Sequence, residues 1–323
     1  MLVVCAALAT APAQSKILMQ PYLQAVTSDY AFVLVECDSK APVIVGYSRE
    51  GEAPVTASTE GLEMTTEKTY VHSVRLKPLA AETAYSYRAM QGGGTGDART
   101  FRTAAKPGSH FRFGWMADCR SHPDIHAAIA VRLKDAHPDF LLYGGDLCRN
   151  EEYKSFKDEF FISEELDLVS RTPFFNAVGN HEAWERNTMA FTEAPDSASK
   201  TQSYYSFDCG DLHVLVLNTE DDHGRKSAQF EFARDDLKKS KARWKIVTCH
   251  KPAYCGGGHR NDEGMTVISK KLFEPEKVDI VLSGHNHFYQ HNLVNGVHHL
   301  VIGSSGAPLV NPKDRNDRAK PDD

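Results

Sequence analysis

Two histidines, His285 and His287, stand two residues apart where an apolar run ends, in the stretch "VLSGHNHFYQ" at 281–290. Imidazole is the commonest protein ligand for metal ions and also a frequent acid–base group. A solvent-facing pair at the tip of a loop is the alternative interpretation. This stretch alone leaves both open, so the ends of the other apolar runs have to decide.

Four other apolar runs end in the same way. The runs 111–117, 139–145, 173–179 and 244–249 are followed by Asp118, by Asp146, by Asn180 with His181, and by His250. In open α/β sheets, functional groups gather beyond the carboxyl ends of the strands. One such Asp or Asn is more often a turn former, but five ends with two Asp, one Asn and four His favour a common site. Carboxylates and imidazoles together suit zinc, iron or manganese.

The elements that must position these residues fall into two kinds. Residues 17–103 contain short runs rich in β-branched and aromatic residues, at 31–37, 43–47, 70–76 and 84–90, with a glycine-rich hairpin tip at 91–97. This spacing predicts a β-sandwich. Residues 110–310 alternate apolar runs with amphipathic stretches at 124–137 and 229–241, which predicts an α/β domain with a largely buried sheet.

Composition and termini limit the possible partners. The 323-residue chain carries a formal net charge of -6, so we expect no nucleic-acid binding. An anionic substrate would need a local positive centre, such as a metal ion. Residues 1–13 are typical of an incomplete secretory signal, with a buried N-terminal strand as the alternative, and they are too short to span a membrane. We expect an exported protein without a transmembrane segment, and a polar tail at 311–323.

The order of the motifs resembles a known family. "DCR…GGDL…GNHE…CH…GHNH" is similar to the pattern of the calcineurin-like metallophosphoesterases. "QPYLQAVTSDYAFVLVE", "VHSVRL" and "TAYSYR" resemble the N-terminal domain of purple acid phosphatases, and "LAAETAYSYR" is similar to a corner of fibronectin type III-like domains. The resemblance covers residues 17 to 310. It implies a fibronectin type III-like β-sandwich followed by an α/β metallophosphoesterase domain, a two-sheet αββα sandwich.

The resemblance also implies roles for individual residues around two divalent or trivalent ions of iron, zinc or manganese. Asp146 would bridge both ions. The other ligands would be Asn180, His250 and His285 at the second ion, and Asp118 and His287 at the first. His181 would protonate the leaving oxygen or stabilise the transition state, while a metal-bound hydroxide attacks phosphorus.

Two positions depart from the family pattern, and both concern the first ion. Arg120 stands where the general family has a histidine, and Arg149 stands where purple acid phosphatases have the tyrosine that gives them their colour. Three interpretations stay open: waters fill the gap in a two-ion site, His122 or Asn150 substitutes, or the Arg120 guanidinium partly replaces the first cation. In each of them Arg120 could bind phosphate oxygens.

The function that these residues predict is phosphate-ester hydrolysis, with a phosphomonoesterase as the first expectation. Asn180, His181 and Arg120 would contact the small-molecule substrate, and His259, in a glycine-rich loop after His250, is a further candidate. A phosphodiesterase or nucleotidase on the same fold is one alternative. A non-catalytic binding protein with a degenerate metal site is the other. The sequence does not indicate an oligomeric state.

Overall fold

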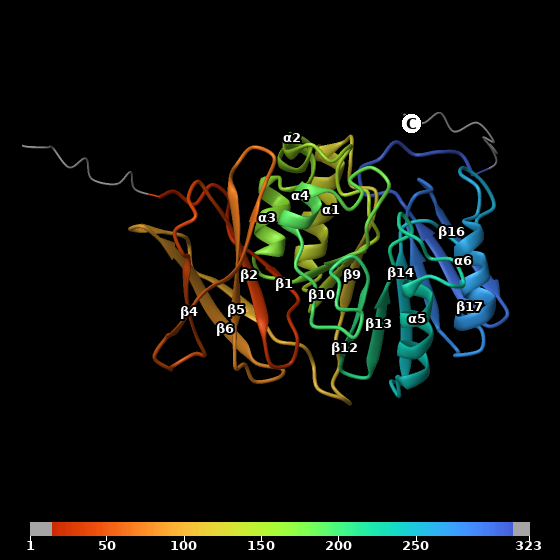
Figure 1. The fold of residues 1–323 in the computed structure, drawn as a ribbon, viewed down its shortest axis with the longest axis horizontal. Coiled ribbons are helices and arrows are strands. Elements are labelled where there is room, and N and C mark those ends of the chain that lie inside the picture. The colour runs from red at the N-terminus through yellow and green to blue at the C-terminus, as the bar shows by residue number, and fades with distance from the viewer. Residues whose placement is uncertain (1–14, 313–323) are drawn as a thin grey trace, which may run out of the picture.

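The computed structural model describes residues 15–312. The predicted signal at 1–13 and most of the polar tail at 311–323 lie outside the described residues. Figure 1 shows a strand-rich N-terminal part on the left, coloured red to orange, which continues into an α/β part towards the right. The expected change from strands alone to strands alternating with helices is therefore found in the structure.

The N-terminal part consists of eight strands. They are β1 (Tyr22–Gln24), β2 (Ala31–Cys37), β3 (Ile44–Ser48), β4 (Val55–Met64), β5 (Tyr70–Leu76), β6 (Ala84–Gln91), β7 (Gly94–Thr95) and β8 (Arg99–Arg102). The four strands expected from the sequence appear within one residue of their predicted bounds. β4 was missed because its side chains are mostly exposed and show no regular apolar alternation. Alternate residues of β2, β3 and β6 pack into one buried apolar cluster.

The α/β part is built on two mixed sheets. The strands are β9 (Phe113–Met116), β10 (Phe140–Tyr143), β11 (Phe174–Asn176), β12 (Tyr205–Cys209), β13 (Leu212–Val216), β14 (Trp244–Cys249), β15 (Ile280–Ser283), β16 (Tyr289–Val294) and β17 (Val297–Ile302). The first sheet pairs β9, β10 and β11 in parallel. The second has the order β12-β13-β14-β15-β17-β16. Apolar residues from both sheets form a shared core between them.

Helices cover the outer faces of the two sheets (Figure 1). Their bounds are α1 (Pro123–Asp135), α2 (Tyr153–Ser155), η1 (Phe156–Phe160), α3 (Ser163–Val169), α4 (Arg186–Phe191), α5 (Ala228–Lys239), α6 (Glu263–Ile268) and η2 (Ser269–Phe273). One core joins α1, η1 and α3 to the first sheet, and another joins α5, α6 and η2 to the second. The layers are therefore helix, sheet, sheet, helix, in agreement with the expected αββα arrangement.

The N-terminal strands are packed against the α/β part and are not merely tethered to it. β1 pairs in parallel with β11, so the first sheet continues from one part into the other. The fully buried carboxylate of Glu36 on β2 accepts hydrogen bonds from Tyr153 (2.7 Å) and Lys157 (2.8 Å) of the other part. The stretch 104–109 connects the two parts, so it divides the chain but not the sheet. No helix within residues 15–312 is long and apolar enough to cross a membrane.

Candidate metal centre

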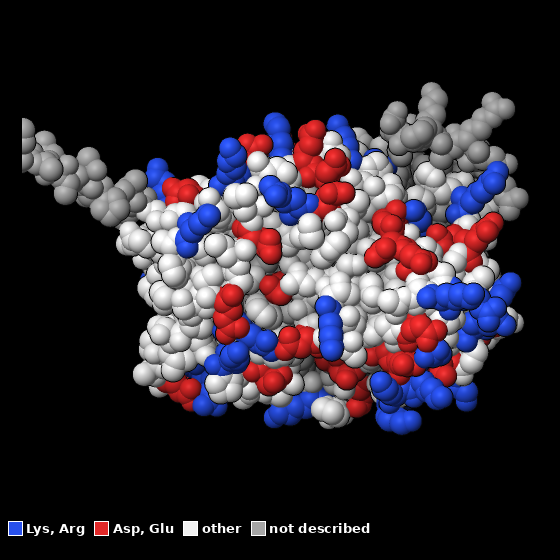
Figure 2. Space-filling view, in the orientation of Figure 1, with Lys and Arg blue, Asp and Glu red and all other residues white. Residues whose placement is uncertain are grey.

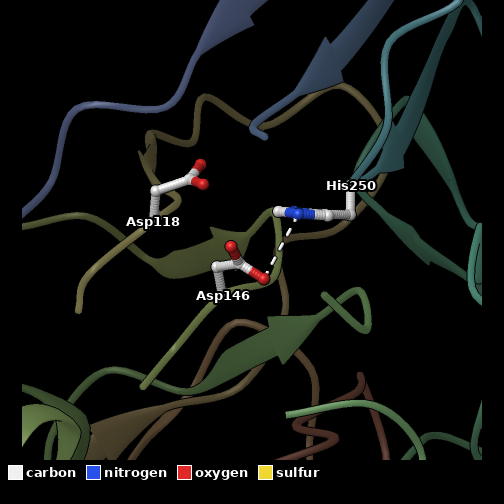
Figure 3. Close-up of side chains that lie close together, drawn as sticks. All are labelled: Asp118, Asp146 and His250. Atoms are coloured by element: carbon white, nitrogen blue, oxygen red, sulfur yellow. Dashed lines mark ion pairs between the residues drawn. The ribbon is translucent and has the colours of Figure 1, made fainter. Parts of the chain in front are cut away.

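Strand ends from both sheets converge on one buried cluster. Asp118 follows β9, Asp146 follows β10 and His250 follows β14, and one ligand atom from each lies within 4.8 Å of the others. Figure 3 shows the two carboxylates and the imidazole directed towards a common space. All three side chains are buried. The structure therefore brings these three residues together from separate strand ends, as the sequence predicted.

The first group of donor atoms centres on Nε2 of His250. This nitrogen lies 3.0 Å from Asn180 Oδ1, 3.2 Å from Asp146 Oδ1 and 3.2 Å from His285 Nδ1. These four side chains come from four different strand ends, and two of those strands belong to each sheet. We call this group of Asn180, Asp146 Oδ1, His250 and His285 the His250 half of the site.

The second group of donors lies around Asp118. Asp118 Oδ1 is 3.3 Å from His287 Nε2, and Asp118 Oδ2 accepts the backbone N–H of His285 at 2.9 Å. Arg120 directs its Nε to Asp146 Oδ2, at 3.6 Å, and its side chain is only 7% exposed. We call Asp118, His287, Asp146 Oδ2 and Arg120 the Arg120 half. The two oxygens of Asp146 therefore belong to different halves.

Backbone carbonyls orient two of the histidines. Nδ1 of His250 lies 2.8 Å from the carbonyl oxygen of Gly144, and Nδ1 of His287 lies 2.8 Å from that of Pro308. A carbonyl oxygen only accepts, so each Nδ1 carries the hydrogen and donates it. The other nitrogen, Nε2, then presents its lone pair to the site, which is the usual arrangement for a metal-ligating histidine.

The backbone at the site adopts unusual conformations. Asp118, Asp146 and His285 have φ values of 58°, 53° and 66°, a region that residues with a Cβ seldom adopt. Such conformations persist only where the surrounding structure imposes them, and they concentrate at functional sites. A Cβ on Gly179 would lie 2.1 Å from the backbone nitrogen of Asp146, so only glycine allows these two loops to approach so closely.

The charges of the site favour a cation. Burial alone would raise the pKa of Asp118, but the adjacent His287 and the charge of His250 outweigh it, so the pKa lies below its usual value. Burial alone would lower the pKa of His250, and the carboxylates of Asp146 and Asp118 outweigh it and raise the pKa. The two carboxylates therefore attract positive charge to a buried position, which is what a metal site requires.

His181 is held in one tautomer beside this cluster. Its Nδ1 donates to the carbonyl oxygen of Arg149 (2.7 Å), because that oxygen can only accept. Its Nε2 then lies 3.6 Å from Asp146 Oδ2, and its backbone N–H donates to Asp146 Oδ1 (3.1 Å). The imidazole is thus oriented with Nε2 towards the site but is not one of the four groups around His250 Nε2.

The remaining candidates from the sequence lie at different places. The ring of His259 stacks on that of His285, with centroids 4.1 Å apart, which brings it to the site. Arg149 points outwards and pairs with Glu159, at 3.3 Å from its Nε. His122 is exposed before α1, and Asn150 Oδ1 accepts from Glu152 N–H and the Ser155 hydroxyl. In the described part of the chain, neither His122 nor Asn150 forms a hydrogen bond or ion pair with the metal-ligand candidates.

Two acids that support the site were not predicted. Glu182 is fully buried, and its Oε1 accepts the backbone N–H groups of Asp146 (3.1 Å) and Gly179 (2.8 Å). Glu159 Oε2 accepts those of Ser121 (3.3 Å) and Arg149 (2.8 Å), and so ties together the loops after β9 and β10. The acid that closes "GNHE" was a sequence signal for Glu182, whereas Glu159 lies within an ordinary amphipathic stretch.

The residues present fit a metal ion in one half better than in the other. The His250 half offers two nitrogen and two oxygen donors, a set suited to zinc, iron or manganese. In the Arg120 half, Asp118 Oδ1 is buried without a hydrogen-bond partner, as a ligand atom would be. That half also contains the Arg120 guanidinium, which stays positively charged and therefore cannot act as a metal ligand. The donor set there is therefore incomplete.

Comparisons with known proteins place these observations in a family. A family model described as calcineurin-like phosphoesterase matches residues 111–289. Purple acid phosphatase 22 of Arabidopsis thaliana is 29% identical over 262 residues, which are 73% of this chain and 58% of that protein. Purple acid phosphatase 18 of the same plant is 28% identical over 311 residues, or 83% of this chain and 66% of that protein.

A solved structure gives the same indication for the fold. The purple acid phosphatase PPD1 from seeds of yellow lupin, Lupinus luteus, superposes with a TM-score of 0.75 at 20% identity, over 90% of this chain and 65% of that one. This likeness extends across both the N-terminal strands and the α/β part. The chain spans between about half and two-thirds of the length of the curated relatives it matches.

Proposed function

The chain belongs to the calcineurin-like phosphoesterase family, and from that premise we propose that it is a metal-dependent phosphoric ester hydrolase that acts on phosphomonoesters. The observation that carries the proposal is the convergence of three side chains on His250 Nε2, each within 3.2 Å. Buried carboxylate, amide and imidazole groups in this arrangement have no apolar packing role. They match a metal site, and they lie within the residues that the family model matches.

A metal ion bound here would supply positive charge to a phosphate group and would lower the pKa of a water molecule towards neutrality. The chain's own residues would bind and orient the ester. The Arg120 guanidinium carries N–H groups that can donate to two phosphate oxygens at once. The amide of Asn180, next to His250, would contact a third oxygen. Together these contacts would hold phosphorus next to Asp146.

His181 would move the proton. Its hydrogen bond to the Arg149 carbonyl fixes the hydrogen on Nδ1, so Nε2 is the atom that gains and gives up a proton on the substrate side. When protonated, Nε2 can donate to the leaving oxygen, and a positioned acid of this kind contributes about 10²- to 10⁴-fold to a rate. The Arg149 backbone therefore acts as a positioning group, although its side chain points away.

The alcohol part of the substrate would lie beyond His259. A cavity of about 560 Å³ is lined by the loop that carries His259, including Gly257, Gly258 and Asn261. It adjoins the ring that stacks on His285. A small or medium alcohol group fits this volume.

The other parts of the proposal concern context. We infer that strands β1–β8 form a fibronectin type III-like domain, since two layers of them enclose one apolar core, and that residues 110–310 are the catalytic domain. We also infer export, from the signal-like residues 1–13. The partner would be a small phosphate ester, and no nucleic-acid binding is expected. On the face drawn in Figure 2, basic and acidic side chains are interspersed rather than gathered into a basic surface.

The proposal is tested by hydrolysis measured together with metal content. Protein purified without chelator would be assayed with a chromogenic phosphomonoester and a matched phosphodiester, before and after zinc, manganese or iron is added. Turnover of the monoester that a chelator removes and added metal restores is the expected result. Bound metal without turnover of either ester would reject the enzyme and favour the binding-protein alternative. Faster turnover of the diester would reject the monoester assignment.

A further inference from the structure

We propose that this protein binds one metal ion, in the His250 half of the site, and that the guanidinium of Arg120 takes the place of a second cation. The inference rests on the proposed function and deepens it, because it states how much of the positive charge comes from the chain itself. It replaces the expectation of two ions that the family resemblance implied.

The His250 half is complete as a site for one ion. Asn180 Oδ1, Asp146 Oδ1 and His285 Nδ1 all lie within 3.2 Å of His250 Nε2. The four atoms lie close together, and the carboxylate and amide oxygens can only accept hydrogen bonds. Hydrogen bonds among the four atoms therefore cannot satisfy all of them. A cation between the four atoms would satisfy them together, and four protein ligands are the usual number for a closed zinc site.

The Arg120 half is not complete. It offers Asp118 Oδ1 and His287 Nε2, 3.3 Å apart, and a share in Asp146 through Oδ2. The two positions that would add a ligand hold arginines. The side chain of Arg149 points away from the site and pairs with Glu159. Arg120 is directed into the site, with its Nε 3.6 Å from Asp146 Oδ2.

The charge of Arg120 decides against a second ion. Its side chain is 7% exposed, so water screens it little, and an arginine does not lose its proton in proteins. Among residues 15–312, its buried Nε has no hydrogen-bond acceptor, and its Nη1 donates to the Ser121 hydroxyl at 3.3 Å. An ion bound to Asp146 Oδ2 would stand next to this fixed positive charge, and repulsion between like charges is strong where solvent is excluded.

The same side chain also provides what the missing ion would have supplied. Asp118 and Asp146 carry two negative charges in a buried site, and Arg120 neutralises one of them without any metal. Its Nη groups would have to reach the phosphate group, since Nε is buried and directed to Asp146. A planar guanidinium is well suited to bidentate contacts with phosphate oxygens. One metal ion and one arginine would therefore share the task of binding the phosphate.

The experiment measures how many ions each chain binds. Chelator-treated protein would be titrated with Mn²⁺ and freed of unbound metal. Ions per chain would be counted by elemental mass spectrometry, and coupling between ions would be read from the electron paramagnetic resonance spectrum. We expect one ion per chain and the spectrum of isolated Mn²⁺ for the unaltered protein. Two ions, or a spectrum of coupled ions, would overturn the inference.

Variants identify Arg120 as the cause. Arg120→Ala and Arg120→His, the second of which restores the family's residue, should bind two ions, whereas Arg120→Lys keeps the charge and should bind one. Arg149→Ala is the matched control, since that side chain points outwards, and should also bind one. A count that stays at one in both Arg120→Ala and Arg120→His would contradict the role of Arg120, with circular dichroism used to verify folding.

The outcomes separate this inference from the proposed function. One ion without ester turnover would leave the inference standing and reject the hydrolase. Two ions with ester turnover would reject the inference and leave the hydrolase standing. No bound ion in the unaltered protein would reject both.

Discussion

The two oxygens of Asp146 face unlike surroundings. Oδ1 points to His250 and its cluster of neutral and anionic donors, whereas Oδ2 faces the cationic Arg120 and the ring nitrogen of His181. One carboxylate thus separates a metal-binding half from a half that already contains a positive charge. The difference indicates that positive charge at a phosphate-binding site can be divided between an ion and the chain. Removing one group at a time shows whether the division holds.

The largest effect is expected from His250→Ala. This change removes the central donor of the His250 half. Loss of a residue that only hydrogen-bonds to a metal ligand already lowers metal affinity by about 10- to 100-fold. We expect metal affinity to fall by more than about 100-fold and hydrolysis to become undetectable. Isothermal titration with Zn²⁺ would measure this.

The control for that variant is His299→Ala. His299 is also a buried histidine, but its ring packs on Tyr254 rather than on the site. It should leave metal affinity unchanged. Equal loss in both variants would mean that His250 matters only for packing, and the division of the site into halves would fail.

The second effect is on catalysis without metal loss. His181→Ala removes the proton donor but none of the four donors around His250 Nε2, so we expect turnover to fall about 10²- to 10⁴-fold while the bound metal stays constant. Steady-state kinetics and elemental analysis of the same samples would show the split. His122→Ala, an exposed change before α1, should alter neither. If the His181 variant loses its metal, the role of His181 as a proton donor that does not bind metal would be wrong.

How far the sequence predicted these two halves can be judged from the same residues. Asp118, Asp146 and His250 were predictable because each follows an apolar run directly, and local sequence determines a strand and its end. The directions of Arg120 and Arg149 were not. Both replace family residues next to the site, yet one turns inwards and the other turns out to Glu159. That choice depends on acids brought near by tertiary structure.

Long-range pairing set similar limits elsewhere. The carbonyl of Pro308 orients His287, and β1 joins β11 across 150 residues of chain. Neither contact leaves a local pattern. The exposed strand β4 was missed for a different reason, because its few apolar residues do not form a regular alternation. The elements were therefore more predictable than the contacts that connect them.

The third effect concerns stability and involves a buried acid beside β10, the strand that precedes Asp146. Glu165 accepts a hydrogen bond from Tyr143, at the end of β10, and lies 3.4 Å from His126 of α1. Burial raises the pKa of Glu165 to about 8 and lowers that of His126 to about 4. Both groups are therefore uncharged at pH 7. The folded protein keeps a proton on Glu165 that the unfolded chain releases.

The sign of the pH dependence follows from that proton. A raised carboxyl pKa contributes stability at low pH that is lost as pH rises towards the folded-state value. Between pH 6.5 and 8, Glu165 should lower the free energy of unfolding by up to about 1.4 kcal/mol per pH unit. His126 is still partly protonated in the unfolded chain at the lower end of this range, and its opposite contribution is common to both proteins compared. Glu165→Gln keeps the hydrogen-bond acceptor and should lose this part of the slope. Urea unfolding at pH 6.5, 7.25 and 8 would measure it, and equal slopes in both proteins would refute the assignment.

The smallest effect is optical and concerns Arg149, whose side chain points away from the site. Iron bound to a tyrosinate absorbs visible light, and Arg149 stands where purple acid phosphatases have that tyrosine. Tyr143 ends β10, the strand that precedes Arg149, but its hydroxyl donates to Glu165. We therefore expect the iron-loaded protein to show no charge-transfer band above about 500 nm, and Arg149→Tyr is the informative variant. A tyrosine there produces colour only if its ring turns inwards, towards an ion in the Arg120 half. The band could be absent from Arg149→Tyr and present in the double variant with Arg120→Ala. This result would show that the Arg120 guanidinium, and not the missing tyrosine, keeps the Arg120 half free of metal.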